Sequence, residues 1–393
     1  MSLTSIVGRL VALLPEQLIR VLPAAAFRFS PAEIPAELPV SSASRRLLVA
    51  PVNFAGQGFQ WAHSVEKIDA DTHGENMVYV ARGDAFKFEA DLRVPLPVYM
   101  WSRRWQKAHR AHVLANMTHV LVEAQRPIYS GPFRSSLLRE VREMQAAGIS
   151  VAAVCHGSDI RLPSRHAAEF AESPLTREFM PAVARLEADV RARARVLARM
   201  NVPTFVSTPD LLRDVPSATW LPVVVDVDAW TAPKPALQGT AKLIVAHAPS
   251  KAAVKGTDAI EPTLRKLEAE GLIEYRAITG VPHAEMPAAF AQADVVLDQF
   301  RLASYGVAAS EAMAAGRLVV SHVSAQVREH VKSATGLDLP IVQATAQELE
   351  AVLRSIAADR AAYRATALAG QKFAKTVHDG TFSAKVLAGF LGV

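Results

Sequence analysis

Residues 294–320 constrain the fold of this chain more than any other stretch, because strand, turn and helix patterns follow one another there without a gap. Residues 294–297 are largely apolar and β-branched, and residues 303–306 form a turn of mostly small residues. Residues 307–315 are rich in alanine and end before Gly316. This order predicts a strand, a tight loop, a helix with a C-terminal glycine and a further strand. Such a loop presents free backbone N–H groups and the positive end of a helix dipole, which suits a phosphate.

Glu311 is the one carboxylate in the predicted helix 307–315. An apolar residue would cost less at this position if the helix is buried. Glu311 is therefore either a functional side chain that contacts a ligand or an ordinary side chain that faces solvent.

The same alternation of short apolar segments and helical stretches runs along the rest of the chain. It predicts an α/β protein with mostly parallel sheets, in which ligands bind at the carboxyl ends of the strands. The predicted strands are residues 46–52, 77–81, 119–123, 150–155, 204–207, 220–225, 242–246, 273–279, 294–297 and 339–342.

The length of 393 residues exceeds what a single core supports, so we expect two main domains. Residues 230–239 are polar, contain prolines and lack a strand pattern, which is typical of a linker. The predicted parts are N-terminal amphipathic helices with a connector (1–45), a first α/β domain (46–229), the linker (230–239), a second α/β domain (240–372) and a C-terminal helical segment (373–393).

The composition restricts the partners of the protein. Lys and Arg number 43 and Asp and Glu 38, which gives a formal net charge of +5. This small excess fits anionic small molecules or a lipid surface and argues against a nucleic-acid partner, which needs a concentrated basic face. The single Cys155 excludes an intrachain disulfide and indicates a reducing compartment. Because we find no membrane-spanning run and no signal peptide, we expect a cytoplasmic protein that can reach the inner face of the cell membrane.

Residues 3–22 have apolar side chains at near-helical spacing, with Pro15 as a break. They form an interfacial membrane anchor, a packing element of the first domain, or a face for self-association into a homo-oligomer. Residues 101–112 are rich in Arg, His and Trp. This second stretch either contacts lipid headgroups or a phosphorylated acceptor, or is a solvated helix face.

Polar residues follow several predicted strands. Gly56 and Gly58 lie in a strand-to-helix turn without the G-x-G-x-x-G spacing of a dinucleotide site, which favours an acceptor or substrate loop. Glu123 ends another strand, and His156 and Asp159 follow the next one. His156 is a candidate base or hydrogen-bond donor, with a structural histidine as the alternative. In the second domain, Ser250, Lys251 and Lys255 follow a strand in a loop that suits a diphosphate.

Residues 240–325 resemble the donor-binding domain of retaining, nucleotide-sugar-dependent glycosyltransferases of the GT-B kind, similar to family 4. The matching stretches are His247-Ala248-Pro249-Ser250, Lys255-Gly256-Thr257, Ala293-Asp294-Val295-Val296-Leu297, Ser304-Tyr305-Gly306 and Glu311-Ala312-Met313-Ala314-Ala315-Gly316. The N-terminal half is similar to the acceptor domain only through Gly56-Gln57-Gly58 and His156-Gly157-Ser158-Asp159. The resemblance implies two Rossmann-like doubly wound domains that face each other across a cleft, with the C-terminal helix crossing back to the first domain.

The resemblance also implies roles for individual residues. Lys255, with Lys251, would bind the donor diphosphate, and Glu311 the nucleotide ribose. The full predicted sets are His156, Lys255 and Asp298 for catalysis; Ser250, Lys251, Lys255, Gln299, Ser304, Tyr305, Gly306 and Glu311 for the donor; and Gly56, Gln57, Gly58, Glu123 and Asp159 for the acceptor. No Asp-x-Asp metal motif stands out, so we expect the positive groups to replace a metal ion and no cofactor to be needed.

Two positions depart from the family pattern. Ala303 stands where the first of two glutamates is expected, and Ser250 stands where an arginine is expected. Asp298 or Gln299, at the end of a strand, could supply the missing polar contacts.

The predicted function is the transfer of a sugar from a nucleotide-diphosphate sugar to a saccharide or lipid-linked acceptor, in polysaccharide or glycoconjugate synthesis. Two alternatives stay open: a nucleotide-sugar epimerase or hydrolase of the same fold, and a catalytically silent nucleotide-binding subunit. A dehydrogenase is disfavoured, because the dinucleotide fingerprint is absent.

Overall fold

The structure is a computed structural model that describes residues 3–22, 24–83, 87–131, 136–239 and 242–393. The chain forms two compact units. Unit 1 contains Met1–Asp159, Ala192–Phe205 and Ala384–Val393, and unit 2 contains Ile160–Arg191 and Val206–Ser383. Among the residues described, no helix combines the length and the apolar character needed to cross a membrane.

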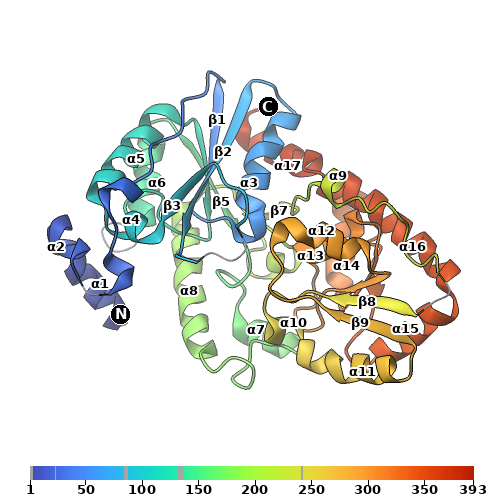
Figure 1. Ribbon diagram of the computed structural model, residues 1–393. Helices are drawn as coiled ribbons and strands as arrows, with labels where there is room; N and C mark the ends of the chain where they lie inside the picture. The colour runs from blue at the N-terminus through green and yellow to red at the C-terminus, as the bar shows by residue number, and fades with distance from the viewer. Residues whose placement is uncertain (1–2, 23, 84–86, 132–135, 240–241) are drawn as a thin grey trace. The chain divides into compact units, whose positions relative to one another are not determined.

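Among the residues described, the first sheet has seven strands in the order β3-β2-β1-β4-β5-β6-β7. Figure 1 labels β1, β2, β3, β5 and β7. The strands are β1 (Arg45–Ala50), β2 (Thr72–Val80), β3 (Leu92–Pro95), β4 (His119–Glu123), β5 (Ser150–Cys155), β6 (Thr204–Val206) and β7 (Thr219–Trp220). The strand pairs β3–β2, β2–β1, β1–β4 and β4–β5 are parallel. From β1 the chain moves to β2 and β3 on one side and then to β4 on the other, so the sheet has a topological switch point between β1 and β4.

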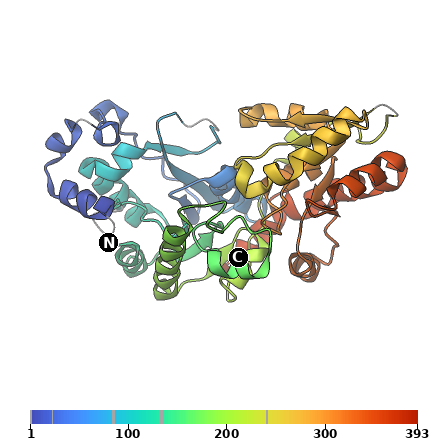
Figure 2. The same ribbon diagram turned by 90° about the horizontal axis from the view of Figure 1, so that it is seen from below.

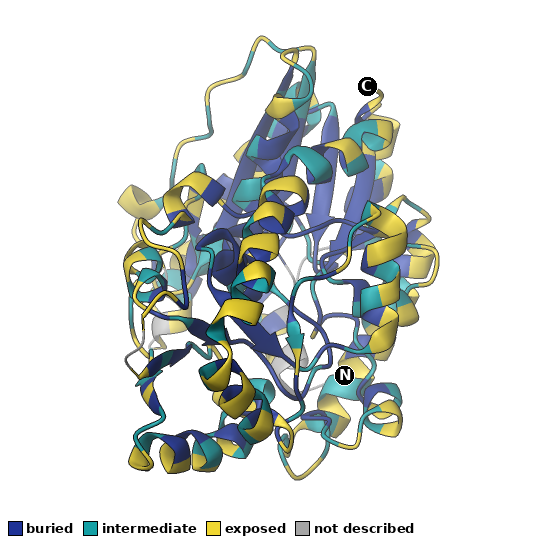
Figure 3. Cartoon of the chain, turned by 90° about the vertical axis from the view of Figure 1, so that its right-hand side faces the viewer, coloured by how far each residue is buried: buried dark blue, intermediate teal, exposed yellow. Residues whose placement is uncertain are grey.

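Helices cover the sheets and leave the strands buried, as Figure 3 shows in dark blue. In unit 1 they include α3 (Gln57–Ser64), α4 (Leu96–Trp101), α5 (Arg103–Asn116) and α6 (Leu137–Ala146). The end of α17 (Thr381–Leu391) also belongs to unit 1, where Arg45 Nε donates to the Leu391 carbonyl at 3.2 Å. The predicted return of the C-terminal helix to the first domain is therefore confirmed.

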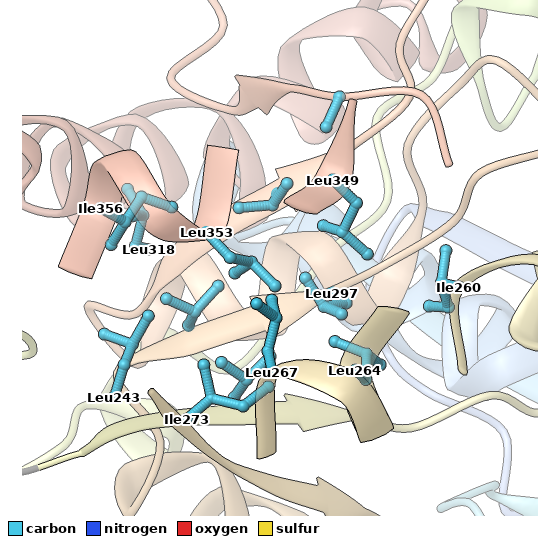
Figure 4. Packing of buried hydrophobic residues seen from close by; sticks show 14 of the residues in the cluster. Leu243, Ile260, Leu264, Leu267, Ile273, Leu297, Leu318, Leu349, Leu353 and Ile356 are labelled. Carbon is cyan, nitrogen blue, oxygen red and sulfur yellow. The ribbon is translucent and has the colours of Figure 1, made fainter. Parts of the chain in front are cut away.

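The second sheet has five parallel strands in the order β12-β11-β10-β8-β9. They are β8 (Leu243–His247), β9 (Ile273–Ala277), β10 (Val295–Leu297), β11 (Leu318–Ser321) and β12 (Val342–Gln343). Leucine and isoleucine side chains from the strands, from α11 (Thr257–Ala269) and from α15 (Leu349–Ala358) fill the core (Figure 4). The switch point lies between β8 and β10, since β9 and β10 flank β8 on opposite sides. Two parallel-stranded α/β units confirm the predicted fold class.

Some predicted elements differ from the observed ones. The edge strand β3 was not predicted. The predicted strand 220–225 contributes only β7, because its later residues bond to the C-terminal segment: Val225 N–H donates to the His378 carbonyl at 2.8 Å. The predicted strand 339–342 begins only at Val342, because the Arg328 guanidinium group donates hydrogen bonds to the carbonyls of Leu339 and Ile341.

The units also differ from the predicted domain boundaries. Ile160–Arg191 and the residues after Val206 belong to unit 2, whereas the predicted first domain extends to residue 229. The predicted linker 230–239 lies within unit 2, where Leu237 is buried and its N–H donates to Asp294 Oδ1 at 2.7 Å.

The N-terminal residues form two helices, α1 (Leu3–Leu13) and α2 (Glu16–Arg20), separated at Pro15 as predicted. They lie beside α4 and α5 (Figures 1 and 2). Arg103, at the start of α5, donates to the carbonyls of Ala12 and Leu14 at 3.2 and 2.9 Å, and its N–H donates to Glu16. The end of α1 is thus fixed to the start of α5.

Glu75 on β2 predicts a pH-dependent stability. The residue is 6% exposed, and burial, followed by the charges of Asp91 and Glu37, raises its pKa to about 7. The folded state holds the Glu75 proton more tightly than the unfolded state does, so protonation of Glu75 favours folding. This contribution is fully present below the unfolded pKa of 4.5 and is lost as the pH rises through 7. Relative to the wild type, Glu75→Gln should therefore gain about 3 kcal/mol of unfolding free energy between pH 4.5 and pH 8. Denaturant unfolding of both proteins at the two pH values measures this gain. The same difference in unfolding free energy between variant and wild type at both pH values would contradict the prediction.

Candidate functional site

The loop after β8 places the predicted diphosphate ligands. α10 (Ala252–Lys255) is a short helix, and Gly256 follows it with a φ of 81°. Residues other than glycine rarely adopt this left-handed conformation. A Cβ atom on Gly256 would also lie 3.2 Å from the Cγ atom of Arg301. Gly256 therefore allows the chain to turn sharply after Lys255 and begin α11.

Lys255 and Asp298 form an ion pair at the carboxyl ends of the adjacent strands β8 and β10. The Nζ atom of Lys255 lies 2.6 Å from the Oδ1 atom of Asp298, and their side chains are 15% and 2% exposed. Within the part of the chain that the structure describes, the Oδ2 atom of Asp298 has no hydrogen-bond partner. Asp298 thus fixes the ammonium group of Lys255, whose remaining N–H groups are available to an anion.

The helix α13 (Val307–Ala314) begins in the loop after β10. Gly306 precedes it, and the space around a Cβ atom on Gly306 is empty within 4 Å. The first N–H groups of a helix have no partner within that helix. This end of α13 is therefore open to an anion, which the helix dipole favours.

Glu311 lies on the buried side of α13, so the interpretation that it faces solvent is wrong. It is 7% exposed, and its Oε1 atom lies 2.9 Å from the Nε2 atom of His283. Burial raises the pKa of Glu311, while His283 and Lys255 lower it. The sequence did not reveal His283 as a partner, because 28 positions separate the two residues.

Three predicted donor residues hold the loop between β10 and α13. The Gln299 side-chain amide donates to the Ser304 carbonyl at 2.6 Å, and the Ser304 hydroxyl donates to Asp210 Oδ1 at 2.7 Å. The Tyr305 hydroxyl lies 3.4 Å from His378 Nε2. All three predicted residues are buried, and the structure therefore places them where they shape the loop.

Ser250 and Lys251 are exposed in the loop after β8. Arg301 reaches the same region from the loop after β10. Its guanidinium group donates to the Ala253 carbonyl at 2.8 Å and to both oxygens of Asp258 at 2.8 Å. The sequence did not reveal Arg301, since no spacing rule relates a residue after β10 to the loop after β8.

Ala303 occupies a buried position with a left-handed backbone, which disfavours the glutamate that the family pattern predicts. It is fully buried, has a φ of 52°, and its carbonyl accepts a hydrogen bond from Ser324 N–H at 2.9 Å. A glutamate there would combine a left-handed backbone with a buried charge, and both are unfavourable. The loop is therefore built around a small residue at this position.

The loop after β1 contains the predicted acceptor residues Gly56, Gln57 and Gly58. Gly56 has a φ of 76° at the start of α3. A Cβ atom on Gly58 would lie 2.8 Å from the Oε2 atom of Glu123 and 2.7 Å from the Nδ2 atom of Asn76, so only glycine fits. Gln57 is buried, and its amide donates to the Ala55 carbonyl at 3.3 Å.

His156, Glu123 and Asp159 come together at the carboxyl ends of β4 and β5. The His156 Nε2 atom lies 3.1 Å from the Glu123 Oε1 atom. Glu123 is fully buried, which raises its pKa, while the close approach of His156 lowers it. Asp159 Oδ1 accepts from the N–H groups of His156 and Gly157 at 3.0 and 2.7 Å. Glu123 and Asp159 thus position His156.

No model of a known protein family matches this sequence, and no curated protein matches it either. Several solved structures do. Anabaena Alr3699/HepE in complex with UDP has a TM-score of 0.55 and 13% identity, with 88% of this chain and 99% of that chain covered. Sucrose-phosphate synthase (tll1590) from Thermosynechococcus elongatus has a TM-score of 0.53 and 11% identity, with 88% and 98% covered. A glycosyltransferase from Rickettsia africae has a TM-score of 0.53 and 10% identity, with 89% and 98% covered.

This chain has the GT-B fold. In a GT-B protein at this level of identity, the activity is inferred from the side chains and not from the fold. At the switch point of the second sheet, Lys255 pairs with Asp298, and the charges of both act on Glu311.

Proposed function

We propose that this protein is a glycosyltransferase that moves a sugar from a nucleotide-diphosphate sugar to a saccharide or lipid-linked acceptor, with retention, in polysaccharide or glycoconjugate synthesis. The observation that carries the proposal is the convergence of Lys255, the open N-terminal end of α13 and Glu311 at one switch point. A diphosphate requires a cation and N–H donors, and a ribose requires a hydrogen-bond acceptor. The likeness in fold to a glycosyltransferase from Rickettsia africae and to Anabaena Alr3699/HepE in complex with UDP supports it.

The chemistry follows from the leaving group. When the bond to the diphosphate breaks, negative charge grows on its oxygens while the sugar becomes oxocarbenium-like. The Lys255 ammonium group and the first N–H groups of α13 would stabilise that charge, and the exposed Lys251 would add a second cation. We propose that these groups act in place of a metal ion.

His156 would act on the acceptor. Glu123 holds its ring at the carboxyl end of β4, where the imidazole can hydrogen-bond a hydroxyl group of the acceptor and orient it for attack.

A thermal-shift screen with UDP-, GDP-, ADP- and dTDP-sugars tests the proposal. We expect one nucleotide to raise the unfolding midpoint, because a ligand at 100 times its Kd adds about 2.7 kcal/mol to the stability of the folded state. No shift with any of them would refute the donor site. Release of nucleotide that depends on an added acceptor would then support a transferase, whereas release that does not would indicate a hydrolase.

We further propose that the N-terminal helices place the protein on a membrane. In α1, Val7, Leu10 and Leu13 are 47%, 60% and 77% exposed, and their spacing puts them on one helix face. In and just after α2, Leu18 and Val21 are 52% and 74% exposed. The exposed basic residues Arg104 and Lys107 lie on α5, to which α1 is fixed. Apolar and basic side chains together suit an anionic lipid surface.

The double variant Leu10→Gln/Leu13→Gln should lose co-sedimentation with phosphatidylglycerol vesicles, because two exposed leucines no longer enter the lipid. Leu368→Gln, on α16 (Arg360–Phe373), is a matched control, since Leu368 is 55% exposed in unit 2. Equal sedimentation of the wild type, the double variant and Leu368→Gln would rule out the membrane anchor. A dimer that only the double variant loses would indicate self-association instead.

A further inference from the structure

Arg126 follows two left-handed residues in the loop after β4. Ala124 and Gln125 have φ angles of 51° and 50°. Residues other than glycine stay in this region only where their surroundings hold them. Here the Ala124 N–H donates to the Val154 carbonyl at 3.0 Å, and the Gln125 amide donates to Asp159 Oδ2 at 3.4 Å. These bonds fix the turn from which the Arg126 side chain extends.

The Arg126 guanidinium group lies over two aromatic rings. Its central carbon is 5.9 Å from the ring centre of Phe54 and 5.6 Å from that of Tyr79. The residue is half-buried. Among residues 3–22, 24–83, 87–131, 136–239 and 242–393, the three nitrogens of its guanidinium group have no hydrogen-bond or ion-pair partner, although this group carries five N–H donors.

Two buried arginines of this chain bind protein acceptors. Arg301 binds both oxygens of Asp258, and Arg317 donates to the carbonyls of Ala315 and Ala293 at 2.8 and 2.9 Å. The guanidinium group of Arg126 is only partly buried, so its N–H donors can reach a ligand. An unpaired, half-buried guanidinium group held by a strained turn is therefore suited to a ligand.

The charges around Arg126 favour an anion. Burial and the neighbouring Arg193 lower the pKa of Arg126, while Asp159 raises it. The carboxylate of Asp159 already accepts from the backbone N–H groups of His156 and Gly157. The positive charges of Arg126 and Arg193 thus act on each other, and the carboxylate that acts on Arg126 is already hydrogen-bonded to the backbone.

The location of Arg126 connects it with the predicted acceptor loop. It follows β4 and Phe54 follows β1, the two strands that flank the switch point of the first sheet. Phe54 is 44% exposed, and its ring lies 5.1 Å from the ring of His156. An exposed aromatic ring can stack on the apolar C–H face of a sugar.

We propose that unit 1 binds an acidic saccharide, one whose phosphate or carboxylate group is held by Arg126 and whose ring lies against Phe54. This inference rests on the proposed function, because it takes the bound saccharide to be the acceptor of the sugar transfer. It adds the chemical class of the acceptor: an anionic sugar is bound, and its neutral counterpart is not.

Titration calorimetry of the full chain with glucose 6-phosphate, glucuronate, inorganic phosphate and glucose tests the inference. We expect at least one of the two acidic sugars to bind, the neutral glucose not to bind, and the affinity to fall with added salt. Glucose 6-phosphate and glucuronate separate a phosphate from a carboxylate preference. Arg126→Gln should weaken the binding at least about tenfold, and Arg126→Lys should give an intermediate value because it keeps the charge and loses the planar fork.

Two controls separate this site from the donor site. Arg142→Gln, an exposed arginine on α6, should bind acidic sugars as the wild type does. Nucleotide binding should be unchanged in Arg126→Gln, which also shows that the variant is folded. Failure of both acidic sugars to bind, or equal binding by Arg126→Gln, overturns the inference even if nucleotides bind. Acidic-sugar binding that requires Arg126 in a chain that binds no nucleotide refutes the proposed function alone.

Discussion

Replacing Lys255 by methionine should lower the affinity for a nucleotide diphosphate about 10- to 100-fold, because a charge-assisted hydrogen bond contributes about 1.5–3 kcal/mol. The same change leaves Asp298, which is 2% exposed, without its counter-charge. An unpaired buried charge costs about 3–5 kcal/mol, so we also expect a lower unfolding midpoint. Titration calorimetry with the nucleotide and thermal unfolding measure the two effects.

The double variant Lys255→Met/Asp298→Asn distinguishes binding from folding. It removes both charges of the pair, so we expect its stability to return close to that of the wild type while nucleotide affinity stays low. Recovery of affinity together with stability would mean that Lys255 serves the fold and not the ligand.

Replacing His156 by alanine should reduce sugar transfer about 100-fold or more, since positioned acid–base groups contribute about 10²–10⁴-fold. Donor affinity should not change, because His156 belongs to unit 1 and the donor residues to unit 2. Glu123→Gln should give a smaller loss, because the ring keeps a neighbour of the same shape but not a carboxylate acceptor. Steady-state kinetics with both substrates varied separates the effect on kcat from that on donor KM.

The alternative for His156 is a purely structural role. It predicts that His156→Ala lowers the unfolding midpoint while the folded fraction transfers sugar at the wild-type rate. Correcting the measured rates for the folded fraction therefore decides between the two.

The sequence predicted best the elements whose signals are local. β4 and β5 have the bounds that their apolar runs predict, and α1 and α2 separate at Pro15. Gly316, with a φ of 65°, follows α13 as the glycine signal indicates. β3 was missed because a short edge strand, Leu92–Pro95, with alternating burial does not differ from a loop in composition.

The contacts of the site depend on residues far apart in the chain. The Lys255–Asp298 pair exists because β8 and β10 are neighbours, although β9 separates them in sequence. The position of Arg126 depends on two left-handed residues of ordinary type, which no sequence rule identifies. The sequence could therefore indicate which loops bind ligands, but it could not indicate which side chains are paired and which are available.

The central claim is that a nucleotide diphosphate binds at the switch point of the second sheet. A crystal structure of the protein with the nucleotide selected by the thermal-shift screen tests this most directly. We expect diphosphate oxygens within hydrogen-bonding distance of the Lys255 Nζ atom and of the first N–H groups of α13, with the ribose at Glu311. A diphosphate bound elsewhere in the chain, with Lys255 still paired only to Asp298, would contradict the account.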